Sequence, residues 1–245
     1  MRLTITSPTD VIALSDHYED PHHVWAIRKD GISGLFGTPS TRESPLERPQ
    51  MSGAYWPSRL TQPSRTISLD CYIRCASTLE AARARDRINA LMGQPLTLMV
   101  EDVSGRRMID CYLTADPEPL MRMRMQAFEF ALILTCPDPY WLGELQWTRL
   151  GYASQTIPIT NPGTAPTWLR FRTSSRITHL DVVYGDAEIS WEGDTTSLTL
   201  DTRDMIPSAG QVTADWALPV QPGTTQLTIR TDCSQLEVGF RPAWR

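Results

Sequence analysis

The 245-residue sequence predicts a mainly β protein of the α+β class, built from two domains. Alternating apolar and polar residues recur in short segments along most of the chain, and one segment alone has clear helical spacing. The string CPDPYW, at 136–141, then separates a region with a helix from a region without one. We therefore expect an N-terminal domain at 1–145, like a β-barrel or sandwich with one covering helix, and a C-terminal β-sandwich at 146–245.

The first 65 residues contain short strands and then an irregular segment. Apolar pieces at 11–14, 24–28 and 32–36 are separated by turn residues and read as strands. Residues 37–65 hold five prolines, at 39, 45, 49, 57 and 63, and arginines that alternate with small polar residues at 42, 48, 59 and 65. A long irregular segment is unusual inside a compact domain. It is either disordered or held by something else, such as a neighbouring subunit.

A half-buried strand and the helix follow. In TISLDCYIRC, at 66–75, every second residue is apolar, which is the period of a strand with one buried face. The helix is expected at about 77–92, with Ser77 as its N-cap and Glu80 reaching back to the Ser77 amide, a capping box worth roughly 1 kcal/mol. Its apolar stripe comprises Ala81, Ala84, Ile88, Leu91 and Met92. Gly93 supplies the left-handed residue after the helix.

The remaining segments are read as strands. LTLMVEDVSGRRMIDCYLT, at 96–114, predicts a hairpin that turns at Ser104-Gly105, and Phe128 to Cys136 predicts a long strand. From about residue 152 no helical pattern occurs. Seven or eight short strands separated by turns, over roughly 95 residues, are typical of a β-sandwich.

Composition and charge exclude several classes of protein. The net charge of −5 lacks the basic excess of a nucleic-acid binder, and we expect no nucleic-acid surface. The N-terminus has no secretory pattern and no run of 18 apolar residues occurs, so we expect neither Sec-type secretion nor membrane spanning. The five cysteines, at 71, 75, 111, 136 and 233, favour buried free thiols in a reducing compartment over a disulfide framework.

Chemical motifs are weak, and we expect no catalytic residues, no cofactor and no metal. His17, Glu19, Asp20, His22 and His23 form one possible metal cluster, but their spacing matches no standard zinc pattern and a solvated loop explains them better. No nucleophile setting such as G-x-S-x-G is present, and GISGLFG lacks the strand and helix that a phosphate-binding loop requires.

Aromatic and basic residues offer two further candidate surfaces. Trp168, Trp191 or Trp216 could form a platform for a sugar, although filling a hydrophobic core is the commoner use of tryptophan. Arg122 and Arg124 alternate with methionines and could face a lumen or a neighbouring subunit. A merely solvated strand face explains them equally well.

Several strings of the sequence, in their order along the chain, resemble the distal tail proteins of long, non-contractile-tailed phages. The first region contributes TISLDCYIRC, LEAARARDRINALMG, the hairpin and FALILTCPDPYW. The second contributes TIPITNPGTAPTWLRFR, SLTLDTRD and LPVQPGTTQLTIRTDCSQLEVGFRPAW, which is similar to a galectin-like sandwich. The resemblance covers nearly the whole chain, and it is carried by the order of the strings.

The resemblance implies a non-enzymatic structural protein of the virion, located at the tail tip and assembled in the host cytoplasm. Family members form a ring, usually a hexamer, between the tail tube protein and the tail-associated hub protein, and their sandwiches offer docking points for receptor-binding proteins. Segment 37–65 then resembles an arm laid on the adjacent subunit. Its candidate interface residues are Arg42, Arg48, Tyr55, Trp56 and Arg59, to which Arg122 and Arg124 are added. The alternative is a carbohydrate-binding module or the accessory domain of a glycan-active enzyme.

Overall fold

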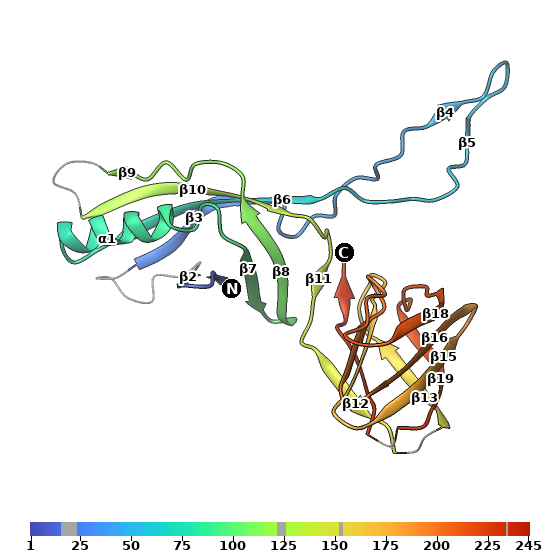
Figure 1. Cartoon of the computed structure of the whole chain (residues 1–245). Coiled ribbons are helices and arrows are strands. Elements are labelled where there is room, and N and C mark those ends of the chain that lie inside the picture. Colours follow the sequence, from blue (N-terminus) through green and yellow to red (C-terminus); the bar gives the residue numbers. More distant parts are fainter. Residues whose placement is uncertain (16–23, 122–125, 152–153, 234) are drawn as a thin grey trace. The chain divides into compact units, whose positions relative to one another are not determined.

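The computed structural model describes residues 1–15, 24–121, 126–151, 154–233 and 235–245, and it confirms the mainly β fold. The chain divides into two compact units, Met1–Trp141 and Leu142–Arg245 (Figure 1). The short strand β11 (Trp141–Leu142) lies at the division, and β21 (Ala243–Trp244) is near the C-terminus. The described residues include no helix with the length and apolarity to span a bilayer.

The first unit is a closed β-barrel. Seven strands follow one another in the order β8-β7-β1-β2-β3-β6-β10, and a pairing of β8 with β10 completes the circle. Their bounds are β1 (Arg2–Thr6), β2 (Val11–Ser15), β3 (Val24–Ser33), β6 (Arg65–Arg74), β7 (Leu96–Asp102), β8 (Gly105–Leu113) and β10 (Ala127–Cys136). Strand β9 (Leu120–Met121) pairs with β10 at Phe128 and Glu129, away from the β8 pairing.

Alternation explains the barrel core, because every second side chain points inward. In β6 the burial pattern alternates over the whole strand, as predicted. The fully buried side chains include Leu3, Ile5, Ile67, Leu69, Ile73, Leu98 and Leu134. Strand β1 was not predicted, yet it lies between β2 and β7 in the sheet, with Leu3 and Ile5 in the core.

Helix α1 (Thr78–Asn89) lies within the predicted 77–92 and buries Ala81, Ala84 and Ile88. Its N-cap is Ser77, whose hydroxyl accepts a hydrogen bond from the Glu80 amide at 3.2 Å. The Glu80 carboxylate reaches back and accepts from the Ala76 amide at 2.9 Å, one residue before the amide that we predicted. Gly93 has the expected positive φ of 77°. Met92 is 42% exposed and is not part of the buried stripe.

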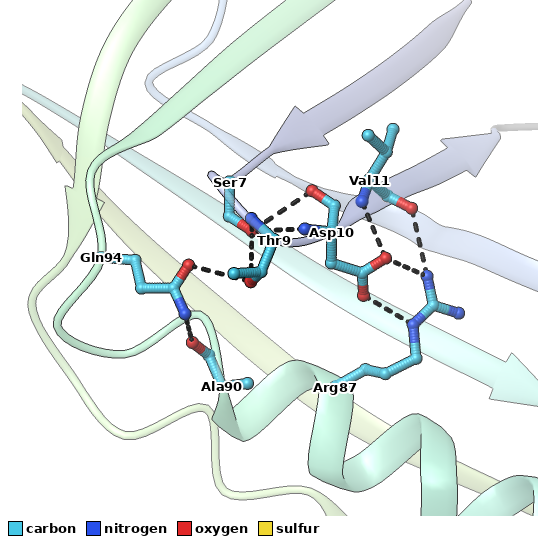
Figure 2. A network of polar contacts seen from close by, with 7 residues as sticks. All are labelled: Ser7, Thr9, Asp10, Val11, Arg87, Ala90 and Gln94. Carbon is cyan, nitrogen blue, oxygen red and sulfur yellow. Dashed lines mark hydrogen bonds and ion pairs between the residues drawn. The ribbon is translucent and has the colours of Figure 1, made fainter.

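The polar face of the helix is tied to the β1–β2 turn (Figure 2). The Arg87 guanidinium donates to both carboxylate oxygens of Asp10, at 2.6 and 2.9 Å, and to the Val11 carbonyl at 3.1 Å. Gln94 accepts from the Thr9 hydroxyl at 3.4 Å and donates to the Ala90 carbonyl at 2.7 Å. Arg87, on the polar face of the helix, therefore serves the fold of the same subunit.

This ion pair predicts a pH-dependent coupling between Asp10 and Arg87. The hydrogen bond from Arg87 lowers the pKa of Asp10, so the stabilisation is full above about pH 4, the unfolded pKa, and is lost as the pH falls through the lower folded pKa. Both side chains are partly exposed, so we expect only about 0.5–1 kcal/mol at pH 7. A double-mutant cycle of D10N and R87Q, measured by urea unfolding, would give this coupling. A coupling of the same size at pH 2 would contradict the assignment.

The second unit is a sandwich of two antiparallel sheets. The four-stranded sheet has the order β12-β20-β14-β17, and the five-stranded sheet has the order β13-β19-β15-β16-β18. Their bounds are β12 (Gln146–Arg149), β13 (Ser154–Asn161), β14 (Leu169–Thr173), β15 (Ile177–Tyr184), β16 (Ala187–Thr195), β17 (Leu198–Asp201), β18 (Gln211–Trp216), β19 (Gly223–Thr231) and β20 (Glu237–Phe240). One cluster of buried residues, including Phe171, Leu180, Trp191 and Ile229, fills the space between the sheets.

Candidate assembly interface

A long arm leaves the barrel between β3 and β6, as Figure 1 shows in pale blue and cyan. We define the arm as residues 38–62. We predicted an irregular segment, but the arm contains a two-stranded ladder of β4 (Leu46–Glu47) and β5 (Ala54–Tyr55). The Arg48 amide donates to the Gly53 carbonyl at 3.0 Å and closes the turn at the tip of this ladder.

Further bonds inside the arm hold its two sides together. The Arg42 amide donates to the Thr61 carbonyl at 2.9 Å, and the Thr61 amide donates to the Glu43 carboxylate at 2.8 Å. The hydrogen bond from the Thr61 hydroxyl, followed by the bond from the Thr61 amide, lowers the pKa of Glu43. At the base, the Gln62 side chain donates to the Pro39 carbonyl at 3.4 Å. The arm is thus a paired extension, although it has no core of its own.

The arm exposes large apolar side chains. Trp56 is 84% exposed, and the exposed set also includes Leu46, Met51, Tyr55 and Leu60. Arg42, Arg48 and Arg59 are exposed as well, and the Arg48 guanidinium lies 5.5 Å from the centre of the Tyr55 ring. Aromatic and arginine side chains gathered in this way are typical of the centre of a protein interface. The apolar residues would each gain roughly 1.5–3 kcal/mol on full burial.

Arg65 fixes the root of the arm. We grouped it with the arm arginines, which was wrong, because Arg65 is the first residue of β6 and only 2% exposed. Its guanidinium donates to the carbonyls of Gly34, Leu35 and Gly37, at 3.1, 3.2 and 2.6 Å, and to that of Pro139, at 2.9 Å. Burial lowers the pKa of Arg65. These bonds set the direction in which the chain leaves β3.

Two neighbours complete the root. The Trp141 ring centre lies 5.9 Å from the Arg65 guanidinium, and the indole N–H donates to the Leu35 carbonyl at 3.3 Å. Gly34 has φ of 75°, and a Cβ at this position would lie 2.0 Å from the Thr66 carbonyl oxygen. Only glycine fits there. Sequence reasoning missed this cluster, although a glycine shortly before the arm and an arginine at the start of an apolar strand were visible signals.

The three candidate sugar platforms differ in exposure. Trp191 is fully buried, and its indole N–H donates to the Ala209 carbonyl at 2.8 Å, so it belongs to the sandwich core and offers no surface to a sugar. Trp168 is half-buried. Trp216, at the end of β18, is 74% exposed. Of the three, Trp216 is therefore the one whose side chain is largely open to solvent.

Several sequence candidates have no structural description. Arg122 and Arg124 lie outside the described residues, as does the cluster of His17, Glu19, Asp20, His22 and His23. In the described part of the chain, no group of three or more His, Cys, Asp or Glu side chains is placed to hold a metal. All five cysteines are buried free thiols, as predicted.

Comparison with solved structures identifies the architecture. The chain matches the Dit protein of SPP1 with a TM-score of 0.67, 15% sequence identity and 99% coverage of both chains. That protein is described as a paradigm of the hub adsorption apparatus in phages that infect Gram-positive bacteria. It also matches a chain of the phage P2 baseplate in its activated conformation with Ca, with a TM-score of 0.54, 12% identity, and coverage of 100% of this chain and 98% of that one. No family model and no curated protein sequence matches. The chain therefore has, over its whole length, the fold of the SPP1 Dit protein.

Proposed function

We propose that this chain is a structural, non-enzymatic component of a phage tail tip. The observation that carries the proposal is the likeness to the SPP1 Dit protein, which extends over 99% of both chains and so includes both units. The barrels form a ring, with six copies as the family resemblance leads us to expect. The ring joins the tail tube protein to the tail-associated hub protein, and the protein becomes part of the virion after assembly in the host cytoplasm.

The arm is the part of the molecule that we assign to ring contacts. Its bonds are internal while its apolar side chains face outward, so its backbone is organised without burying Trp56 or Leu46. In the ring, the arm lies on the adjacent subunit, and these side chains become buried there. Arg42, Arg48 and Arg59 contribute polar contacts to this interface.

The sandwich is assigned to docking of other tip proteins or receptor-binding proteins. Its exposed apolar side chains include Trp216 and Ile206, which are 74% and 71% exposed. Trp216 also keeps the alternative of a carbohydrate-binding module open for testing. A sugar platform needs convergent polar groups beside the ring, and burial of Trp191 removes one of the tryptophans on which that alternative rested.

Negative-stain electron microscopy of the full-length protein tests the proposal. We expect hollow particles with rotational symmetry, and no binding in a glycan screen run with the W216A variant as a control. Isolated monomers that bind a glycan in a Trp216-dependent way would favour the carbohydrate-binding alternative and overturn the proposal.

A further inference from the structure

The barrel is closed by a short seam between β8 and β10. The paired residues along this seam are Leu113 with Leu134 and Tyr112 with Thr135. One step further in the same register, Cys111 faces Cys136. Both side chains are on the inward face of their strands, at 4% and 0% exposure. Two thiols therefore meet across the seam on which closure of the barrel depends.

The backbone at this position suits a disulfide. The Thr114 amide donates to the Ile133 carbonyl at 3.0 Å, which marks that pair as a hydrogen-bonded position of the seam. Hydrogen-bonded and non-hydrogen-bonded pairs alternate in an antiparallel ladder, so Cys111 and Cys136 fall at a non-hydrogen-bonded position. Cα atoms of such a pair are about 4.5 Å apart, at the near end of the range that disulfides span.

The two thiols interact and have different acidities. The hydrogen bond with Cys111, followed by the charge of Arg65, lowers the pKa of the Cys136 thiol, against the effect of burial. The hydrogen bond with Cys136, together with burial, raises the pKa of Cys111. Cys136 therefore loses its proton more readily than Cys111, and the thiolate is the nucleophile in thiol–disulfide exchange.

A hollow at the surface gives a reagent a route to this pair. It has a volume of about 850 Å³, and its wall includes Cys111, its neighbours Asp110 and Tyr112, and Pro137, which follows Cys136. Cys136 is 0% exposed and is not part of this wall, so a reagent reaches the pair at Cys111.

We propose that Cys111 and Cys136 are a redox-active pair that forms a disulfide across the barrel seam. The oxidant is a low-molecular-weight disulfide. Cys111, which lines the hollow, loses its proton and attacks one sulfur of that disulfide, so that a mixed disulfide forms and one thiol is released. The Cys136 thiolate then attacks the Cys111 sulfur and releases the second thiol. The protein loses two electrons and two protons, and the small disulfide is reduced to two thiols. In a reducing compartment both cysteines stay free.

Mass spectrometry of the full-length protein tests this pair. After incubation with oxidised glutathione, denaturation and iodoacetamide blocking, we expect the five free thiols to fall to three. Trypsin cleaves between the two cysteines, at Arg122 and Arg124, so the product is a cross-link between two separate peptides that contain Cys111 and Cys136. The thermal midpoint of the barrel should rise by about 5 °C and return after reduction.

Two variants separate this mechanism from general thiol oxidation. C136S should keep a glutathione adduct on Cys111, because no second thiol is present to displace it, and its thermal midpoint should not rise. C233S, which removes a buried thiol from the sandwich, should still form the cross-link. Five unmodified thiols in the wild type, or a cross-link that involves Cys71 and Cys75, would overturn the proposal. Either result is independent of whether the protein forms a ring.

Discussion

Deletion of residues 40–62 should abolish assembly and leave both units folded. The hydrogen bonds described above hold the arm to itself, and Pro39 and Gln62 are joined at its base, so a short Gly-Ser link can replace the arm without straining the barrel. The deletion removes the exposed side chains of Trp56, Leu46 and Tyr55 from the subunit contact at the same time. We expect the subunit affinity to fall by at least about 30-fold, the loss expected from one central interface residue. Analytical ultracentrifugation over a concentration series would measure the change.

A pair of single variants locates this effect. W56A should weaken assembly in the same direction as the deletion, whereas W216A removes another strongly exposed tryptophan, from the sandwich, and should leave assembly unchanged. Because association stabilises the folded subunit, stability should be compared at concentrations where all variants are monomeric. An arm-deleted protein that assembles as well as the wild type would exclude the arm as a subunit contact.

Replacement of Arg65 should destabilise the barrel by about 3 kcal/mol or more. In R65M the carbonyls of Gly34, Leu35, Gly37 and Pro139 lose a donor in a buried setting, and each loss carries a desolvation cost. R65K should be intermediate, because an ammonium group cannot reproduce the planar fork of donors. Native-state hydrogen exchange of the amides in β6 would report the change in opening free energy.

The same experiment contains its own controls. R42M removes an exposed arm arginine and should change the opening free energy of β6 by no more than about 0.5 kcal/mol. Amides of β15 and β19 in the sandwich core should keep their protection in R65M. Unchanged protection of β6 in R65M would show that the four contacts contribute little to stability.

Periodic patterns predicted the local structure of this chain well. The alternation in β6 and the capped helix depend on residues close in sequence, and both are found where they were expected. Strand β1 was missed because it is only five residues long and its RLTIT string carries two large apolar residues, a signal too short to stand out. Its place between β2 and β7 depends on a strand about 95 residues later in the chain, which no local pattern can encode.

The roles of single side chains were harder to predict, because they depend on tertiary contacts. Arg65 and Arg42 stand in similar local sequences, yet one is buried against four carbonyls and the other is exposed. Trp191 and Trp216 both lie in strands of the same sheet, and only the alternation within β16 and the packing of the second sheet bury Trp191. Likewise, the position of Cys111 opposite Cys136 could be found only from the register of β8 against β10, which depends on the tertiary structure.

Native mass spectrometry of the full-length protein tests the central claim, that this chain works by assembling into a ring. The subunit mass is 27.6 kDa. We expect one dominant closed oligomer at an integral multiple of that mass, six as the family resemblance implies, which the deletion of residues 40–62 converts to monomer. A wild-type protein that stays monomeric at every concentration of the series would contradict the account.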